Sequence, residues 1–219
     1  MPLHKVAQCL SDESECAIIT LLHTGHNQMY KLKHHFLHNC EDLDFLLKTN
    51  KLSVFISRLI KQASKQDPDC YNPLQYMGDG WEFFAEFFFK FHNGDHTFTY
   101  LWDYEPNLGL DNGIDGFGKS TLDGSLATVQ CKFVADPDKY LTNEHNVGNH
   151  ATASLNEGWR PNGKNLICFT SAAGIHRSHA YADQALCLNR KLISRRVNNN
   201  VAFWTIFRNT VKENLNANN

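Results

Sequence analysis

Residues 113–134, near the middle of the 219-residue chain, read GIDGFGKSTLDGSLATVQCKFV. The first eight, Gly113–Ser120, fit the pattern G-x-x-x-x-G-K-S/T of a phosphate-binding loop. The last nine, LATVQCKFV, have the composition of a β-strand, and the pair Asp123-Gly124 between the two parts is a typical turn. The stretch is therefore either a phosphate loop that leads into a helix or the two arms of a β-hairpin.

The residues on either side of Gly113–Ser120 favour the hairpin. A phosphate loop follows a buried apolar strand and leads into a helix whose N-terminus faces the phosphate. Here the preceding residues, DYEPNLGLDN, are polar and contain a proline, and the following Gly124 is a turn residue rather than the interior of a helix. A nucleotide kinase or NTPase that uses Gly113–Ser120 is kept as an alternative.

A hairpin would bring a carboxylate opposite an amide and an amine. Asp115 lies on the first arm, and Gln130 and Lys132 share one face of the second, because strand residues two apart point the same way. Hydrolysis of a phosphodiester needs oxygen ligands for a hard divalent ion and a group that activates water. Asp115, the amide oxygen of Gln130 and the backbone carbonyl of Cys131 can supply ligands. Lys132 can orient or deprotonate the water.

The segment WEFFAEFFFKF, residues 81–91, predicts a helix that can add a further carboxylate. Its polar residues Glu82, Glu86 and Lys90 are spaced four apart and form one stripe on an otherwise apolar helix. We expect Glu82 to complete the metal site, with Glu86 as the competing position. Alternatively, the two glutamates simply form the solvent-exposed face of the helix.

The remaining patterns predict an α/β domain with a helical N-terminal extension. Apolar residues at helical spacing recur over residues 12–65, and the polar, proline-containing segment 65–73 has the composition of a linker. We therefore divide the chain into an extension, residues 1–70, and a main domain, residues 71–219. Within the main domain we expect strands at residues 97–102, 126–134 and 165–170, a helix at 184–193, and either a strand or a helix at 201–207.

Four segments in order resemble the Mrr-type branch of the PD-(D/E)xK restriction-endonuclease-like superfamily. They are GWEFFAEFFFKFHNG, LDNGIDGF, ATVQCKF and NLICFTSAAGIHRSHAYAD. The resemblance implies a mixed central sheet flanked by helices, and a DNA endonuclease that depends on Mg2+ or Mn2+. It places Glu82, Asp115, Gln130 and Lys132 on the four active-site positions, and so makes residues 71–219 the catalytic domain. The resemblance does not cover the first 70 residues.

Charge is unevenly distributed along the chain. The net charge is −2, but residues 79–157 carry 13 acidic and 4 basic residues, whereas residues 158–219 carry 2 acidic and 9 basic residues. An acidic middle beside a basic end suits a cation site next to a phosphate-binding surface, although the two blocks can also neutralise each other in the fold. The residues that we expect to contact DNA are Lys119, Ser120, His176, Arg177, Arg190, Lys191, Arg195 and Arg196.

The N-terminal region is rich in histidine, and the chain has seven cysteines without the spacing of a disulfide framework or a zinc finger. No apolar run approaches the roughly 20 residues that span a bilayer, and no secretory signal is visible. We therefore expect an intracellular, cytoplasmic protein that binds DNA and no membrane, with a homodimer as a reasonable arrangement for cutting two strands. A DNA-binding module without catalytic activity is the third hypothesis, beside the nuclease and the phosphate-loop enzyme.

Overall fold

The computed structural model describes residues 31–39, 44–91, 100–109, 113–156 and 165–216. Residues 31–219 form one compact unit, distinct from residues 1–30. The helices expected before residue 31, and the first three residues of the strand expected at 97–102, lie outside the described residues.

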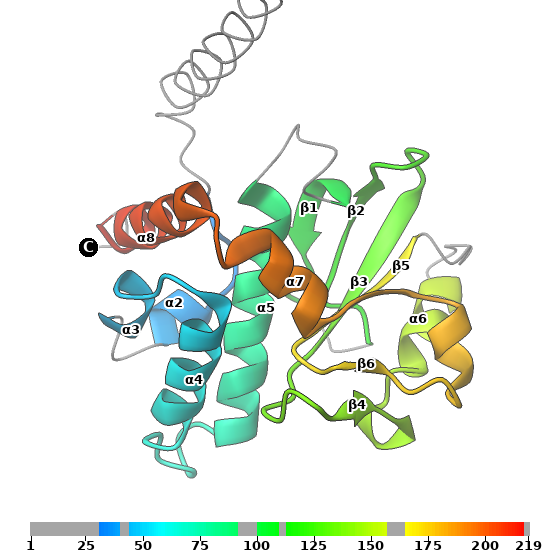
Figure 1. Ribbon diagram of the computed structural model, residues 1–219, viewed down its shortest axis with the longest axis horizontal. Coiled ribbons are helices and arrows are strands. Elements are labelled where there is room, and N and C mark those ends of the chain that lie inside the picture. Colours follow the sequence, from blue (N-terminus) through cyan, green and yellow to red (C-terminus); the bar gives the residue numbers. More distant parts are fainter. Residues whose placement is uncertain (1–30, 40–43, 92–99, 110–112, 157–164, 217–219) are drawn as a thin grey trace, which may run out of the picture. The chain divides into compact units, whose positions relative to one another are not determined.

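A five-stranded mixed sheet forms the centre of the described unit (Figure 1). In spatial order its strands are β1 (Leu101–Pro106), β2 (Gly116–Ser120), β3 (Leu126–Lys132), β5 (Leu166–Thr170) and β7 (Leu186–Leu188). The first three strands are antiparallel, whereas β3, β5 and β7 are parallel. Two short strands, β4 (Tyr140–Leu141) and β6 (Gly174–Ile175), form a separate parallel pair. The expected α/β class, with a mixed sheet flanked by helices, is confirmed.

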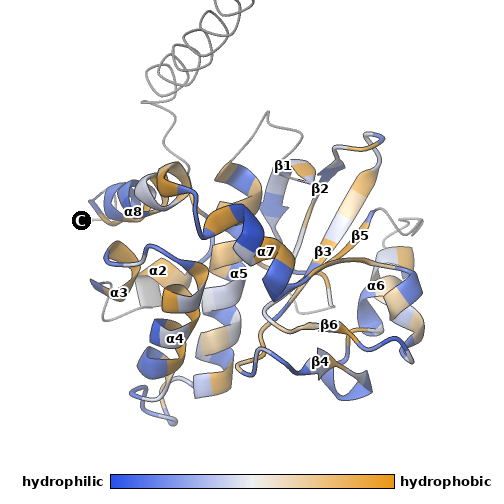
Figure 2. Ribbon diagram, viewed as in Figure 1, coloured by the Kyte–Doolittle hydropathy of each residue, from blue (hydrophilic) through white to orange (hydrophobic). Residues whose placement is uncertain are grey.

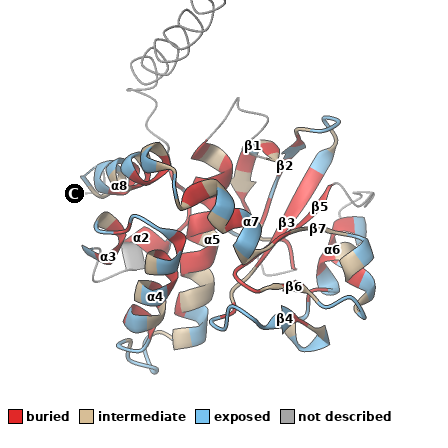
Figure 3. Ribbon diagram, in the orientation of Figure 1, coloured by how far each residue is buried: buried red, intermediate tan, exposed pale blue. Residues whose placement is uncertain are grey.

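The helix α5 (Pro73–Phe91) packs on one face of the sheet through aromatic side chains. Trp81 donates its indole N–H to the carbonyl of Phe169 in β5 at 3.1 Å, and the rings of Phe88 and Phe89 lie 5.2 and 5.3 Å from that of Phe169. Because apolar residues occur on nearly every side of this helix, most of its length is buried (Figure 3). Neither α5 nor any other helix in the described part of the chain is both long and apolar enough to cross a membrane.

At Glu86 the polar stripe of α5 does not face the solvent. The Glu86 side chain is fully buried, accepts hydrogen bonds from the N–H groups of Lys33 and His34 at 2.8 and 2.9 Å, and pairs with Lys90 at 2.6 Å. Three donors thus compensate for the burial of its charge. Glu86 therefore anchors the segment before α2 (Phe36–Asn39) to α5, and its interpretation as a surface residue is wrong.

Helices α3 (Asp44–Leu47), α4 (Leu52–Ala63) and α8 (Val201–Asn216) lie on the side of α5 away from the sheet in Figure 1. The hydrophobic residues of α4 lie toward α5 and its hydrophilic residues away from it (Figure 2). The ring of Phe55 in α4 lies 4.8 Å from that of Phe84 in α5. The predicted boundary at residue 70 thus separates two packed helices. That residues 71–219 form a domain without the first 70 residues stays a prediction.

The opposite face of the sheet is joined to α6 (Asn149–Asn156) by a buried polar network. Nε2 of the fully buried His150 lies 2.8 Å from Oγ1 of Thr128 in β3, and Nδ1 is hydrogen-bonded to the hydroxyl of Tyr181. Thr128 Oγ1 also lies 2.9 Å from Oγ of Ser154. Burial lowers the pKa of His150 to about 3, so the ring is neutral and can use both nitrogens in the network.

Two segments near the C-terminus have a secondary structure that the sequence predicted wrongly or left open. Residues 184–193, expected to be one helix, contain β7 and the start of α7 (Arg190–Val197). The expectation is wrong because β7 pairs with β5, and Asn189 then begins α7 by accepting a hydrogen bond from the N–H of Leu192 at 3.0 Å. Residues 201–207, for which a strand and a helix were both open, belong to α8.

Candidate functional site

The expected hairpin is present, and it holds Asp115 beside β3. Asp115 lies directly before β2 and donates its N–H to the carbonyl of Val129 at 2.8 Å. Its Oδ2 accepts a hydrogen bond from the N–H of Cys131 at 2.5 Å, and its carbonyl accepts one from the N–H of Asn107 at 3.0 Å. One hydrogen bond to the carboxylate and two to the main chain of Asp115 therefore fix this residue at the end of the hairpin where β2 begins and β3 ends.

Glu82 and Asp115 line one cleft, whose volume is about 420 Å³. The Glu82 side chain projects from α5, is 29% exposed, and has its Oε2 3.3 Å from Nε2 of His34. Glu86, one turn further along α5, does not line the cleft because its carboxylate is buried among three donors. Of the two glutamates on the polar stripe, Glu82 is the one that the cleft exposes.

The Gln130 side chain is buried close to the turn that carries Asp115. Gln130 is 1% exposed, and its Oε1 is the one buried side-chain nitrogen or oxygen without a hydrogen-bond partner in the described part of the chain. A Cβ added to Gly113 would lie 3.5 Å from Gln130 Nε2, so the amide lies against the residue two positions before Asp115. A buried amide oxygen without a partner is costly, and a cation in contact with it would relieve that cost.

The two faces of β3 separate the candidate residues as expected. Cys131 on β3 lies beside Phe169 on β5 in the register of the two strands, so the two side chains point to the same face of the sheet. Because the ring of Phe169 contacts α5, Cys131 also points toward α5. Gln130 and Lys132 point to the other face together with Thr128, which contacts α6. Neither Gln130 nor Lys132 lines the cleft that holds the carboxylates.

Asp115 lies where these two faces meet. Burial raises the pKa of Tyr104, which stacks on α5, and the charges of Asp115 and Glu82 contribute to that rise. Burial also raises the pKa of Tyr181 on the α6 side, and the charge of Asp115 contributes there as well. Asp115 lines the cleft together with Glu82, and its carboxylate is bonded to the N–H of Cys131, the residue between Gln130 and Lys132, so it lies next to both groups.

Lys132 places a cation at the end of β3. Its carbonyl accepts hydrogen bonds from Thr170 Oγ1 at 2.7 Å and from the N–H of Ser171 at 3.2 Å, which fix the strand end. Its ammonium has no hydrogen bond or ion pair to any described residue. The pKa of the neighbouring Cys131 thiol is raised, first by burial and then by the nearby carboxylates. The thiol is therefore neutral, and Cys131 can contribute through its backbone.

Gly113–Ser120 lacks the geometry of a phosphate loop. Residues Gly116–Ser120 form β2, which pairs with β1 on one edge and with β3 on the other. The chain then turns through Gly124, whose φ is +71°, as the turn signal predicts, and enters β3. A phosphate loop requires a helix at this point. The structural basis of the kinase or NTPase alternative is therefore missing.

Four residues expected to contact DNA lie on strands or after them. Lys119 is exposed on β2, and so is not in a loop. Ser120 is 1% exposed, and its hydroxyl accepts a hydrogen bond from the N–H of Leu122 at 3.2 Å, so it is occupied within the hairpin turn. His176 and Arg177 are exposed directly after β6. Lys119, His176 and Arg177 can thus reach a ligand, whereas Ser120 is enclosed.

The other four expected DNA contacts lie on α7. Lys191 and Arg195 are exposed. Arg190 is partly buried and donates from Nη1 to a backbone carbonyl at 3.5 Å, and the guanidinium of Arg196 lies 5.9 Å from the centre of the Tyr100 ring. Lys191 and Arg195 are therefore the more open of the four.

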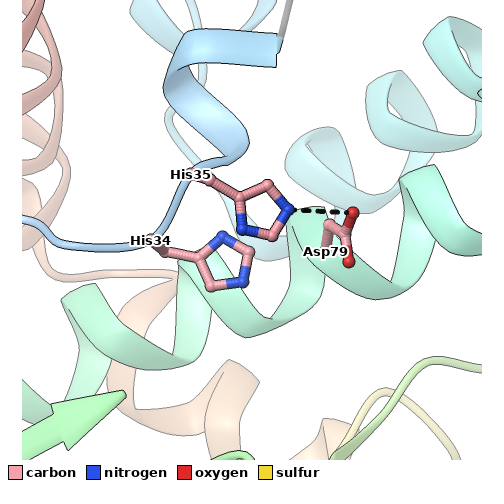
Figure 4. A group of neighbouring side chains, drawn as sticks. All are labelled: His34, His35 and Asp79. Atoms are coloured by element: carbon pink, nitrogen blue, oxygen red, sulfur yellow. Dashed lines mark hydrogen bonds and ion pairs between the residues drawn. The ribbon is translucent and has the colours of Figure 1, made fainter. Parts of the chain in front are cut away.

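Three residues of the cleft, His34, His35 and Asp79, were not among the expected site residues (Figure 4). The two histidines belong to the histidine-rich N-terminal region, whose spacing fits no zinc finger. One possible ligand atom from each lies within 4.8 Å of the others. Asp79 precedes Glu82 by one helical turn, and this spacing could have indicated that both face the same way. The histidines lie more than 40 positions before their partners in α5, so only the folded chain reveals the contact.

The chain matches no protein-family model, no curated protein and no solved structure. The resemblance to the PD-(D/E)xK superfamily therefore stays a prediction.

Proposed function

We propose that the chain is a metal-dependent DNA endonuclease of the PD-(D/E)xK type, with a restriction-endonuclease-like core. One observation carries the proposal. The carboxylate of Asp115 is held on β3 by the N–H of Cys131, and the adjacent Gln130 has a buried amide oxygen without a partner among the described residues. A buried amide oxygen that lacks a donor, beside a fixed carboxylate, is what a bound cation would satisfy.

The donor set fits Mg2+ or Mn2+. Both ions prefer oxygen, and the candidate ligands are the carboxylates of Glu82 and Asp115, the amide of Gln130 and the carbonyl of Cys131. The N–H and C=O of one strand residue point to the same side of the strand. Since the N–H of Cys131 points at Asp115, its carbonyl is directed to the same side. These residues therefore offer four oxygen donors from three elements of the fold.

The residues of the chain have separate tasks in this proposal. Asp115 and Glu82 supply the negative charge that retains the cation. Mg2+ bound there would polarise a phosphodiester oxygen and lower the pKa of a bound water. Lys132, whose ammonium has no partner among the described residues, holds the attacking water or the scissile phosphate and offsets the charge that develops during cleavage.

Exposed basic residues would bind the DNA backbone beside the site. Lys119 on β2, Arg177 after β6, and Lys191 and Arg195 on α7 are all exposed. They belong mainly to the basic C-terminal third of the sequence. Contacts of this type give affinity that falls with salt concentration and carries no sequence information by itself.

A plasmid-nicking assay with Mg2+ or Mn2+ tests the proposal. We expect the protein to relax supercoiled DNA, and we expect Asp115→Asn and Lys132→Ala each to lower the rate by about 100-fold or more, because each removes a group that acts on the reacting phosphate. Lys61→Ala, which removes an exposed lysine from α4, is the matched control and should cleave like the unaltered protein.

Two outcomes would count against the assignment. Cleavage that survives Lys132→Ala would remove Lys132 from the catalytic residues. DNA binding without cleavage under either metal would favour a non-catalytic DNA-binding module with the same fold.

A further inference from the structure

Three side chains with metal-binding atoms meet on the wall of the cleft, and the nuclease proposal uses none of them. His34 and His35 lie directly before α2, and Asp79 belongs to α5. The two imidazole rings stack with their centres 4.5 Å apart and their planes 23° apart. Both rings lie over α5, and His35 points to Asp79 (Figure 4). Residues from two segments therefore place two nitrogens and a carboxylate together.

The distance between His35 and Asp79 matches that between two ligands of one zinc ion. His35 Nε2 lies 3.3 Å from Asp79 Oδ2. Ligands at about 2.0–2.1 Å from a tetrahedral ion are about 3.3–3.4 Å from one another. His35 and Asp79 thus already have the spacing of two ligands of one ion. The ligand atom of His34 lies within 4.8 Å of both, so it needs only a small side-chain movement to join them.

Asp79 is also oriented by a hydrogen bond from a neighbouring side chain, as metal-binding carboxylates usually are. Its side chain is 13% exposed, and its Oδ2 accepts a hydrogen bond from the hydroxyl of Tyr71. No lysine or arginine in the described ranges pairs with it. Outer hydrogen bonds of this type orient the ligands of metal sites.

We propose that His34, His35 and Asp79 bind a divalent transition-metal ion of the zinc class. Imidazole nitrogens suit such an ion, whereas the oxygen donors around Asp115 suit Mg2+ or Mn2+. The cleft then serves two cations of different chemistry. The proposal rests on the side chains of the cleft and not on the nuclease activity.

Binding of the ion through Nε2 of His34 would require a change in that ring. Nδ1 of His34 accepts a hydrogen bond of 3.3 Å from the N–H of Phe36, which puts the ring proton on Nε2, toward Glu82. When Nε2 binds the ion, the proton moves to Nδ1 and the bond from Phe36 is given up. The bond lost is longer than a typical N–H···N or N–H···O contact, so a metal–nitrogen bond outweighs it.

Calorimetric titration of the full chain with Zn2+ tests the site. Excess Mg2+ is present throughout, so that it occupies the oxygen ligands. We expect His35→Ala and Asp79→Asn each to bind one equivalent of Zn2+ fewer than the unaltered protein. We expect Tyr71→Phe to keep that equivalent with about 10-fold lower affinity, because it removes only an outer hydrogen bond. His145→Ala, which removes a histidine outside the cleft, should bind like the unaltered protein.

The folding of the variants can be checked separately. The His35 side chain is 50% exposed, so His35→Ala should melt like the unaltered protein when Zn2+ is absent. The proposal is overturned if His35→Ala and Asp79→Asn bind the full number of equivalents with unchanged affinity. It is also overturned if Asp115→Asn loses the same equivalent, because the ion would then belong to the oxygen ligands.

Discussion

Gln130 places a polar amide at a strand position that is 1% exposed, and its Oε1 has no hydrogen-bond partner in the described part of the chain. A buried acceptor without a donor lowers stability by about 1–3 kcal/mol. Residues that break a local rule of folding in this way are often functional. At the scale of single residues, Gln130 is therefore the position where stability and the proposed function oppose each other most clearly.

Replacement of Gln130 with methionine tests this opposition. Gln130→Met keeps the length of the side chain and removes the polar group, so the metal-free protein should become about 1 kcal/mol more stable. The variant should also lose the added stability that Mg2+ gives to the unaltered protein, together with cleavage. Urea unfolding with and without Mg2+ measures both effects. A variant that is less stable without Mg2+, and still stabilised by it, would contradict the role of Gln130.

At the scale of elements, the contact between α4 and α5 depends on a glycine. A Cβ on Gly80 would lie 2.4 Å from Leu59 Cδ1 and 3.1 Å from Cζ of Phe36, and both of these side chains are fully buried. Gly78, in the same helix, has no atom within 4 Å of the corresponding position. The two glycines therefore form a matched pair within α5.

We expect opposite effects of alanine at these two positions. Gly80→Ala should lower the free energy of unfolding by about 1–3 kcal/mol, because it overpacks the helix contact. Gly78→Ala should raise it by about 0.5–1 kcal/mol, because alanine is the better helix former and meets no neighbour. Urea unfolding of the two variants measures the difference, and equal effects would show that α4 does not approach α5 this closely.

The attachment of α6 to β3 should depend on pH through His150. Burial lowers its pKa from 6.5 to about 3, so between these values the unfolded chain binds a proton that the folded chain does not. Because the folded pKa is the lower one, this contribution to stability is complete above about pH 6.5 and is lost as the pH falls toward 3. The full loss is roughly 4–5 kcal/mol.

Substitution of His150 with glutamine should remove this part of the pH dependence. We expect the free energy of unfolding of the unaltered protein to fall between about pH 7 and pH 4, and that of His150→Gln to fall by several kcal/mol less. Urea unfolding across this range gives both slopes. Equal slopes would mean that the pKa of His150 is the same in the folded and the unfolded chain.

The elements that the sequence predicts well are those with a strong local pattern. The patterns at residues 126–134 and 165–170 predict β3 and β5, and the helical spacing of apolar residues over 12–65 includes the stretch that forms α4. β7 is three residues long, and it becomes a strand only because β5 provides an edge with which it can pair. Its existence depends on tertiary structure, and local periodicity could not predict it.

At the scale of the whole molecule, residues 31–70 are part of the compact unit. We expect removal of residues 1–30 to leave cooperative thermal unfolding intact. Removal of residues 1–70 would also take away α2, α3 and α4 and expose the aromatic side of α5, so we expect that protein to lose cooperative unfolding. Thermal melting followed by circular dichroism compares the two truncations. Cooperative melting of residues 71–219 alone would instead support the boundary expected from the sequence.

The candidate site could be predicted in part because two of its residues lie on one strand. The positions of Gln130 and Lys132 on a shared face follow from strand alternation, and Asp115 follows from the hairpin. The histidines of the cleft could not be predicted, because His34 meets Glu82 across 48 positions of sequence. Nor does spacing show that Glu86 is buried, since this depends on the donors of the segment before α2.

The most direct test of the central claim is the position of Mn2+ in crystals soaked with that ion, located by its anomalous scattering. We predict a peak within coordination distance of an Asp115 carboxylate oxygen, Gln130 Oε1 and the Cys131 carbonyl, and we predict that the peak is absent from Asp115→Asn. No peak at saturating Mn2+, or a peak that contacts neither Asp115 nor Gln130, would contradict the claim that these residues hold the catalytic metal.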